Sequence, residues 1–401
     1  MTTSTHTRTL DRDKPRVCML VRNDLVNDPR VTRHAEALGA HGFKVIVVCT
    51  ASARTRAKER RPDYEVLRVG TGIPLVMERL ALRTKPRSAL RIIVRLVQIF
   101  ILQLALLRAA RGIPTHAYCA NDLDTLLIGV LAAGFDRKLV YDSHELWPDM
   151  LATIPEFARR MLRVYEGLLI RRTDLVMTVN ELIGQVLQSR YSIPKPIEIV
   201  YNCPPARAGL QKRKDSKRGR LKTALYQGRY VPQRGLENLV RAAEFLLPDV
   251  ELLFRGYGPI EGQLKMLASG SKNIRFAQPV AMRELIDAAR TADVGIVSYI
   301  PSNLNNYLAS PNKLFEYINA GLPVAASDIP FLRRTICDND IGVVFDPKDP
   351  HSIARSLNQI TRTKELRRHR KMIVAAALKY NWQTEEKKLL HAYARLLHGF
   401  K

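Results

Sequence analysis

Short apolar runs alternate with amphipathic stretches in both halves of the chain. Apolar runs at residues 16–21, 44–49 and 138–141 predict buried strands, and helical spacing at residues 31–40 predicts a helix between the first two. The same rhythm restarts with a strand at residues 223–227. Strands that alternate with helices are typical of parallel sheets, which bind ligands at the carboxyl ends of their strands. The pattern therefore predicts two α/β domains.

Further segments extend this rhythm along both halves. Apolar runs predict additional strands at residues 115–120, 175–179, 197–201, 252–254, 274–276 and 294–298. Amphipathic spacing predicts additional helices at residues 162–171, 181–190, 282–291 and 387–398, and one that follows Gly235 and ends at Leu246.

Length and charge divide the chain. A chain of 401 residues is too long for one ordinary domain and fits two. A basic run predicts a linker at residues 206–222, between an N-terminal domain at 15–205 and a C-terminal domain at 223–375. We predict that residues 376–401 form a separate C-terminal helical segment. Residues 1–14 are polar and lack the apolar core of a signal peptide, so we predict a disordered tail.

Residues 88–111 are the most apolar segment of the chain. A bilayer span needs about 20 apolar residues, so this segment is long enough. However, Arg91, Arg95 and Gln98 form a polar stripe, and each Arg near the bilayer centre costs about 2.5 kcal/mol or more. A core helix and an interfacial helix both fit. Because an anionic surface attracts the upstream cations, we favour membrane docking over a core helix and disfavour a span; these cations are Arg79, Arg83, Lys85 and Arg87.

The chain is strongly basic, with a formal net charge of +26, which predicts an anionic partner. Nucleic acid is disfavoured because the sequence contains no recognised nucleic-acid-binding motif. The five cysteines are scattered without a C-x-x-C pair, which indicates reduced thiols in a cytosolic protein and no metal site. A dinucleotide-binding enzyme is disfavoured and a P-loop enzyme is excluded, because neither glycine-rich fingerprint occurs.

A candidate anion site lies in the C-terminal half. A short helix is predicted to begin after Pro311 and Asn312 and to end before Gly321. Unpaired amides and the helix dipole make such an N-terminus suitable for phosphate. Glu316, one turn in, can accept hydrogen bonds from sugar hydroxyls. The alternative interpretation is an exposed glutamate on an ordinary helix.

Three cations are predicted to lie near this candidate anion site. Arg229 and Arg234 follow the strand at residues 223–227 in a glycine-flanked loop, and guanidinium groups suit phosphate oxygens. Lys313 begins the short helix. We predict that these cations bind phosphate groups and that Gly256 allows the backbone to approach the ligand closely. Two surface arginines in a very basic protein are the alternative.

Polar residues also follow two strands of the first half. Asp122 and Asp124 come after one strand, and His144 and Glu145 come after another. Open α/β sheets place their chemistry at these strand ends. Asp122 and Asp124 also match the D-x-D metal motif of the GT-A glycosyltransferase fold, but such a short pattern is common by chance, so we predict no metal.

Three segments carry a resemblance to a known family: NDPRV at residues 27–31, YDSHELWPD at 141–149 and SPNKLFEYINAGLPV at 310–324. Together they resemble the retaining family 4 glycosyltransferases of GT-B fold. The resemblance implies two Rossmann-like domains facing across a cleft, with the last helix returning to the first domain. It also implies a nucleotide-sugar donor, no cofactor, and attack by the acceptor from the leaving-group face.

The resemblance assigns roles to residues of this chain. It implies catalytic roles for His144 and Glu316. The implied donor-binding residues are Arg229, Arg234, Gly256, Ser310, Asn312, Lys313 and Glu316, and the implied acceptor-side residues are Arg30, Asp122 and Glu145. One position departs from the family pattern: Leu308 stands where the family has a glutamate that contacts the donor sugar.

We therefore predict a retaining glycosyltransferase of cell-surface polysaccharide synthesis, acting on a glycan or lipid-linked acceptor. Its predicted location is cytoplasmic, peripheral at the inner face of the cell membrane, with an anionic membrane surface as a partner. A sugar-nucleotide epimerase of the same fold is one alternative. A non-catalytic basic protein that binds membranes or nucleic acid is the other, because the net charge favours it and Leu308 leaves room for it.

Overall fold

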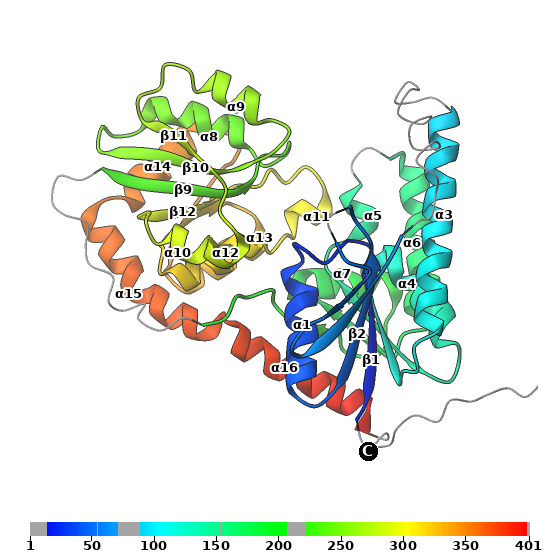
Figure 1. Ribbon diagram of the computed structural model, residues 1–401. Helices are drawn as coiled ribbons and strands as arrows, with labels where there is room; N and C mark the ends of the chain where they lie inside the picture. Colours follow the sequence, from blue (N-terminus) through cyan, green and yellow to red (C-terminus); the bar gives the residue numbers. More distant parts are fainter. Residues whose placement is uncertain (1–13, 54, 71–88, 152–153, 207–220, 399–401) are drawn as a thin grey trace, which may run out of the picture.

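The structure, a computed structural model, describes residues 14–53, 55–70, 89–151, 154–206 and 221–398, with the side chains of residues 89–92 excepted. Nearly all of the predicted tail and of the predicted linker, and the cations at residues 79, 83, 85 and 87, lie outside these described residues. Two domains stand side by side, each with a twisted sheet between helices (Figure 1).

The N-terminal domain is built on an eight-stranded sheet in the order β3-β4-β2-β1-β5-β6-β7-β8. Its strands pair in parallel, except for the antiparallel edge strand β3. Their bounds are β1 (Arg16–Leu20), β2 (Lys44–Thr50), β3 (Lys58–Arg60), β4 (Tyr64–Val69), β5 (Ala117–Asn121), β6 (Lys138–Ser143), β7 (Leu175–Thr178) and β8 (Glu198–Ile199).

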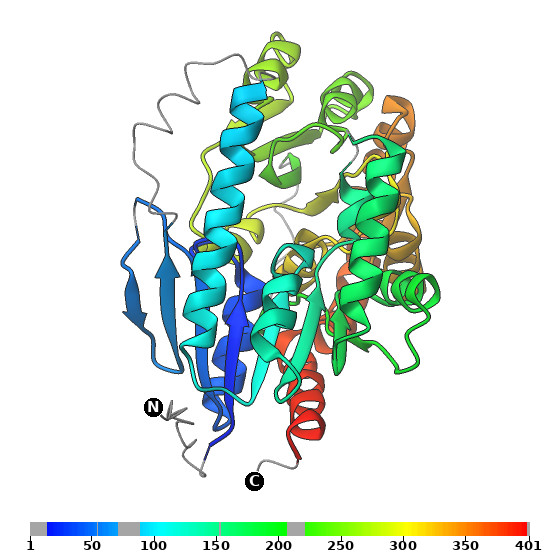
Figure 2. The same cartoon turned by 90° about the vertical axis from the view of Figure 1, so that its right-hand side faces the viewer.

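Helices cover both faces of this sheet. One face packs against α3, α4, α6 and α7, and the other against α1 and α16. In Figure 2, α3, α4 and α6 stand on the face turned to the viewer. The bounds are α1 (Pro29–Ala40), α3 (Ala89–Arg111), α4 (Leu123–Ala133), α5 (Trp147–Met150), α6 (Glu156–Ile170) and α7 (Glu181–Tyr191).

The C-terminal domain holds a six-stranded sheet in the order β11-β10-β9-β12-β13-β14, parallel throughout. Its strands are β9 (Lys222–Arg229), β10 (Val250–Tyr257), β11 (Ile274–Ala277), β12 (Val294–Val297), β13 (Val324–Ser327) and β14 (Gly342–Phe345). Its helices are α8 (Leu236–Ala242), α9 (Glu261–Leu267), α10 (Leu285–Ala289), α11 (Leu304–Tyr307), α12 (Asn312–Ala320), α13 (Pro330–Asp338), α14 (Pro350–Ile360) and α15 (Thr363–Lys379), with 3-10 turns at Ala243–Phe245 and Met282–Glu284.

The last helix, α16 (Trp382–Leu396), returns to the N-terminal domain, as the sequence predicts. Trp382, Leu389 and Tyr393 are buried in the same apolar cluster as strands β1 and β2. The Trp382 ring stacks on His34 with centroids 5.7 Å apart. The chain therefore crosses between the domains twice, and this double connection limits how far they can separate.

Several elements escaped prediction. Strand β3 has the sequence KER, which contains no apolar residue and therefore gives no strand signal. Strand β4 has the sequence YEVLRV, whose alternating burial is typical of a strand, and the sequence analysis did not assign it. Helix α4, which begins at Leu123, was not predicted, because its apolar residues surround the helix and leave no polar stripe. Helices α13, α14 and α15, together with β14, complete the C-terminal domain without having been assigned from the sequence.

The position of α12 depends on a close contact with the sheet. Tyr317 of α12 is fully buried, and its hydroxyl accepts from Gln227 N at 2.8 Å and donates to Leu225 O at 3.1 Å. Its ring lies on Gly295 of β12, where an added Cβ would come within 2.4 Å of ring carbons. A glycine at this strand position therefore lets α12 pack directly on the sheet.

We expect Gly295→Ala to displace α12 and to lower both thermal stability and nucleotide affinity. Overpacking of this kind typically costs about 1–3 kcal/mol. Gly262→Ala is the matched control, because an added Cβ there meets nothing within 4 Å. Thermal unfolding and nucleotide titration of both variants check this expectation. An unchanged unfolding temperature for Gly295→Ala would show that the ring yields without moving the helix.

Candidate functional site

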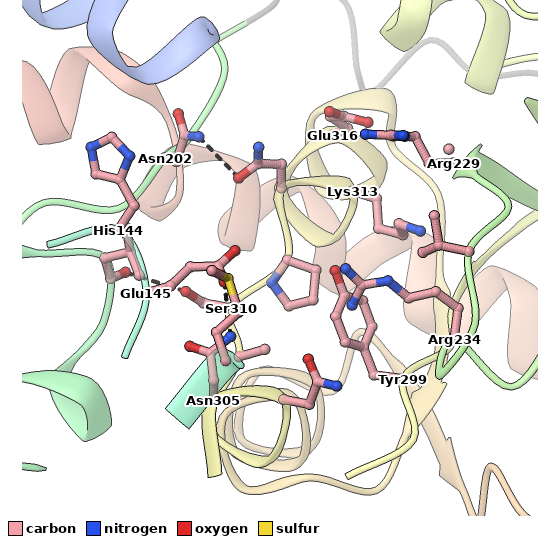
Figure 3. A pocket seen from close by; sticks show the side chains of 18 of the residues that line it. His144, Glu145, Asn202, Arg229, Arg234, Tyr299, Asn305, Ser310, Lys313 and Glu316 are labelled. Carbon is pink, nitrogen blue, oxygen red and sulfur yellow. Dashed lines mark hydrogen bonds between the residues drawn. The ribbon is translucent and has the colours of Figure 1, made fainter. Parts of the chain in front are cut away.

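A cavity of about 700 Å³ lies between the two domains and is lined by residues of both. Such a volume is typical of small-molecule sites. Figure 3 shows His144 and Glu145 of the N-terminal domain on one side, and Arg234, Lys313 and Tyr299 of the C-terminal domain on the other. The site therefore forms where the carboxyl ends of both sheets face each other, as expected for open parallel sheets.

The N-terminus of α12 points into this cavity. Asn312 begins the helix after Pro311, and Gly321 ends it with φ of 71°, a conformation that glycine adopts without strain. Gly228 of strand β9 lies beside this helix: it has φ of 142°, and an added Cβ would lie 3.2 Å from Lys313 Nζ. The first turn of α12 thus presents unpaired amides to the cavity.

Three cations line the C-terminal side of the cavity: Arg229, Arg234 and Lys313. The Arg234 guanidinium lies over the Tyr299 ring at 3.7 Å, and Lys313 Nζ lies 4.0 Å from the centre of the Tyr226 ring. Burial, together with the nearby charge of Arg234, lowers the pKa of Lys313 to about 7. The site therefore holds positive charge that is only partly compensated within the protein.

Glu316 lines the same cavity and interacts electrostatically with Lys313. Burial raises the pKa of its carboxyl group, and the charges of Lys313 and Arg33 oppose that rise. Arg33, from α1, donates at 2.5 Å to Oδ1 of Asn202, a residue that lines the cavity. The sequence analysis did not single out Arg33, because it lies on a helix whose periodicity accounts for it without reference to a site.

Gly256 has a structural role and does not line the cavity among the described residues. An added Cβ would lie 1.8 Å from Gly228 O, so the glycine is needed where β10 and β9 approach each other closely. Gly256 thus supports Gly228, which does line the cavity, and its approach to the donor stays a prediction.

His144 is held between two carboxylates. Its Nδ1 lies 3.2 Å from Asp122 Oδ2, and its Nε2 lies 3.3 Å from Asp142 Oδ2. Although burial alone lowers it, these carboxylates hold the pKa of His144 well above its usual value. Asp122 adopts φ of 64°, which is strained for a residue other than glycine. That conformation places its carboxylate beside His144, so the imidazole is kept as a cation.

Arg30 fixes the position of Asp142 in this network. Its Nε and Nη2 donate to the two oxygens of Asp142 at 2.9 and 2.6 Å, and its Nη1 donates to Val200 O at 2.6 Å. The side chain is 3% exposed. Because all three nitrogens are engaged within the protein, Arg30 positions Asp142 and His144. Arg30 also lines the cavity, and its place on the acceptor side stays a prediction.

The two acids of the D-x-D motif point to different partners. Asp122 accepts from His144 N at 2.9 Å, whereas Asp124 pairs with Arg22 at 3.0 Å. Burial raises the pKa of Asp124 to about 6. Within the part of the chain that the structure describes, no group of three or more His, Cys, Asp or Glu side chains could hold a metal.

Ser310 and Asn312 reach across the cleft. The Ser310 hydroxyl accepts from Asn180 Nδ2 at 3.0 Å, and Asn312 Oδ1 accepts from Asn202 Nδ2 at 3.0 Å. Both residues line the cavity. Their side chains therefore join the domains, while their backbone belongs to the segment that leads into α12.

Comparison with known families identifies the chain. Residues 28–203 match the family model described as a glycosyl transferase 4-like domain, and residues 209–377 match the one described as glycosyl transferases group 1. The chain belongs to the group 1 glycosyltransferases, family 4. The predicted family and the predicted enzyme class are both confirmed.

Individual relatives of this glycosyltransferase differ in how much they share with it. The phosphatidyl-myo-inositol mannosyltransferase of Mycobacterium leprae is 32% identical over 43% of this chain and 46% of its own length. The D-inositol 3-phosphate glycosyltransferase of Geodermatophilus obscurus is 28% identical over 42% of this chain and 39% of its own length. The chain thus matches less than half the length of each of these curated relatives.

Solved structures match this glycosyltransferase over nearly its whole length. Sucrose-phosphate synthase from Thermosynechococcus elongatus has a TM-score of 0.73 at 18% identity, covering 96% of this chain and 100% of that one. Anabaena Alr3699/HepE in complex with UDP-glucose has a TM-score of 0.69 at 14% identity, covering 95% and 99%. These likenesses confirm the predicted GT-B fold.

We expect this glycosyltransferase to take up a proton when it binds a nucleoside diphosphate. The Lys313 pKa of about 7 in the free protein rises when the diphosphate lies beside the ammonium group. The dissociation constant should therefore increase as the pH rises above 7, by at most about tenfold per pH unit, and level off below that pH. Calorimetry in buffers of different ionisation enthalpy measures the proton uptake.

Lys313→Arg is the matched control, because arginine stays charged throughout this range. It should remove the proton uptake. A pH dependence that persists in Lys313→Arg would assign the proton to another group.

Proposed function

We propose that this protein transfers a sugar, with retention of configuration, from a nucleoside-diphosphate sugar to a hydroxyl group of a lipid-linked or glycan acceptor. The observation that carries the proposal is the arrangement of Arg229, Arg234, Lys313 and Glu316 on the C-terminal wall of the interdomain cavity, opposite His144. Family membership supports the reaction class.

The donor diphosphate fits the cation-lined wall. The amides at the start of α12 and the three cations supply hydrogen bonds and positive charge for the phosphates. In the transfer step the bond between the anomeric carbon and the diphosphate oxygen breaks, so negative charge accumulates on the leaving diphosphate. Preorganised cations stabilise that charge. Glu316, in the same wall, accepts hydroxyl hydrogen bonds from the donor.

His144 has a supporting role in this mechanism. Because Asp122 and Asp142 keep it protonated, it cannot accept the proton of the acceptor hydroxyl. A donor phosphate oxygen takes this proton, as the acceptor oxygen attacks the anomeric carbon from the leaving-group side. The imidazolium contributes positive charge at the N-terminal edge of the cavity and faces the bound sugar phosphate.

We propose a lipid-linked acceptor of cell-surface glycan synthesis. The relatives described as phosphatidyl-myo-inositol mannosyltransferases support this choice, because a phosphatidyl-inositol is a lipid. We further propose that the protein works at the inner face of the cell membrane. All five cysteines are free thiols in the structure, which agrees with a reducing compartment.

An apolar surface on the N-terminal domain supports membrane docking. Helices α3, α4 and α6 each carry exposed apolar side chains at helical spacing, and Figure 2 shows the three helices side by side. We call this surface the apolar helix face, defined by Ile93, Leu96, Val97, Phe100, Leu104, Leu127, Leu131, Phe135, Phe157, Met161, Val164 and Leu168. Exposed apolar patches of this extent mark interaction sites.

An anionic bilayer is the partner that this surface fits. Exposed arginines border the apolar helix face: Arg95, Arg108, Arg111, Arg137, Arg160, Arg171 and Arg172. Each basic residue near an anionic bilayer contributes about 1 kcal/mol. Within the described residues, the segment Ile93–Arg111 is long and apolar enough to span a bilayer. However, Leu106 and Ala110 of this segment are buried in the domain core, which favours docking over spanning.

We expect Phe157→Glu with Leu168→Glu to abolish flotation with phosphatidylglycerol-containing vesicles, because two carboxylates would be forced against lipid. Met266→Glu with Leu378→Glu is the matched control, since both are exposed apolar residues of the C-terminal domain. The control should float like the unmodified protein. Light scattering without lipid distinguishes a self-association surface, and a dimer that is lost only in the first variant would overturn the bilayer assignment.

We expect Arg229→Ala and Glu316→Ala each to reduce turnover by about a hundredfold or more, while the fold is retained. Removing one group that stabilises developing charge typically has an effect of about this size. Product analysis with a panel of nucleotide sugars and a lipid extract measures it, and circular dichroism checks the fold. Near-normal turnover in both variants would remove these residues from the site. Sugar-nucleotide conversion without an acceptor would indicate the epimerase alternative.

A further inference from the structure

Leu308 does not face the cavity. Its side chain is 7% exposed and packs in the apolar cluster of the N-terminal domain, together with Leu146, Val179 and Ile183. Its neighbours Asn306 and Ala309 line the cavity, whereas Leu308 is directed toward the opposite domain. A residue of the C-terminal domain therefore completes the core of the N-terminal domain.

Hydrogen bonds hold the same segment across the cleft. Asn180 Nδ2 donates to Leu308 O at 2.9 Å, and Leu146 N donates to Asn305 Oδ1 at 2.8 Å. Figure 1 shows α11, which contains Asn305, beside α5 of the other domain. We call residues 305–310 the cross-domain clasp. Because Asn305 and Leu308 of the clasp are buried and bonded to the opposite domain, these contacts exist only when the domains are closed.

Asn305 also orients an acid. Its Nδ2 donates to Glu145 Oε2 at 3.0 Å, and the side chain is 6% exposed. A backbone N–H can only donate, so the bond from Leu146 N fixes Oδ1 of Asn305 and leaves Nδ2 for Glu145. The amide therefore connects two consecutive residues of the opposite domain and holds the Glu145 carboxylate in one orientation.

Glu145 lines the cavity that Lys313 and Glu316 line from the other side. In Figure 3 its side chain extends from the N-terminal domain toward the C-terminal wall, near Ser310 and Asn305. The sequence analysis placed it on the acceptor side. In the structure, its carboxylate lies beside the clasp. Position 308 of this clasp is where the family has its glutamate and this chain has Leu308.

We propose that Glu145, positioned by Asn305, is the carboxylate that binds the hydroxyl groups of the donor sugar in place of the glutamate that Leu308 replaces. This inference rests on the proposed function. The acid is supplied by the opposite domain, so the sugar-binding part of the site is assembled only on closure. Discrimination between sugars and domain closure are thereby coupled through the clasp.

The test compares a nucleotide sugar with the nucleoside diphosphate that lacks the sugar. Glu145→Gln should weaken binding of the nucleotide sugar by about tenfold or more, because a hydrogen bond to a charged group is lost. It should leave the affinity for the nucleoside diphosphate within about twofold. Calorimetry measures both affinities, and steady-state kinetics measures the KM of the donor and of the acceptor separately.

Asn305→Ala should show the same selective loss, and the double variant with Glu145→Gln should be no worse than either alone. Asn358→Ala is the matched control: Asn358 likewise accepts from a backbone N–H, of Leu247, and donates to a carbonyl, of Phe245, both within the C-terminal domain. It should leave the ratio of the two affinities unchanged. Equal weakening of both ligands by Asn305→Ala would mean that Asn305 only stabilises the closed form, which would contradict the positioning role.

Leu308→Glu restores the family residue and gives the opposing test. Its carboxylate would have to enter an apolar cluster, so the variant should lose affinity for the nucleotide sugar and unfold at a lower temperature. Stronger binding of the nucleotide sugar in Leu308→Glu would overturn the inference. An increase of the acceptor KM alone in Glu145→Gln would return Glu145 to the acceptor side. In both cases transfer by the unmodified protein would still support the proposed function.

Discussion

Positive charge that the protein leaves uncompensated is the constraint on which this structure depends. Lys313 is buried beside Arg234, and its pKa falls to about 7 because charging it there is unfavourable. Tyr226 and Tyr299 supply ring faces for the two cations, but ring faces compensate only part of a full charge. A bound diphosphate brings the missing negative charge. The unfavourable free energy of holding these cations close together is therefore offset when the diphosphate binds.

In the network around His144, by contrast, the charges are paired within the protein. Arg30 and His144 supply two positive charges, and Asp122 and Asp142 supply two negative ones, so this network balances internally. A balanced network holds its geometry in the absence of a ligand. The network around His144 is thus balanced without a ligand, whereas the cation cluster of the C-terminal wall is not. This difference agrees with the assignment of the donor to the C-terminal domain.

The sequence predicted the fold to the extent that its signals were local. Apolar runs located most of the strands, and the helix ending at Gly321 was found because glycine adopts the required conformation there. Roles that depend on contacts between distant residues were not predictable. Arg30 matched a family motif but is engaged by Asp142 and Val200, and Gly256 is conformationally permissive but packs on Gly228. Pairing across a sheet or a cleft leaves no local pattern in one sequence.

Leu308 shows how a departure from a family pattern acquires a structural meaning. Compared with the family sequence, the leucine removes a carboxylate from the site. In the structure, the Leu308 side chain packs in the apolar cluster of the other domain. Asn305, three residues earlier, donates a hydrogen bond to the carboxylate of Glu145. The residue at position 308 therefore contacts the opposite domain, whereas the family's glutamate at this position contacts the ligand. A site assembled in this way responds to closure as a whole, because the same few residues hold the domains together and position the acid. The family pattern, in which one domain supplies both acids of the motif, does not require such coupling.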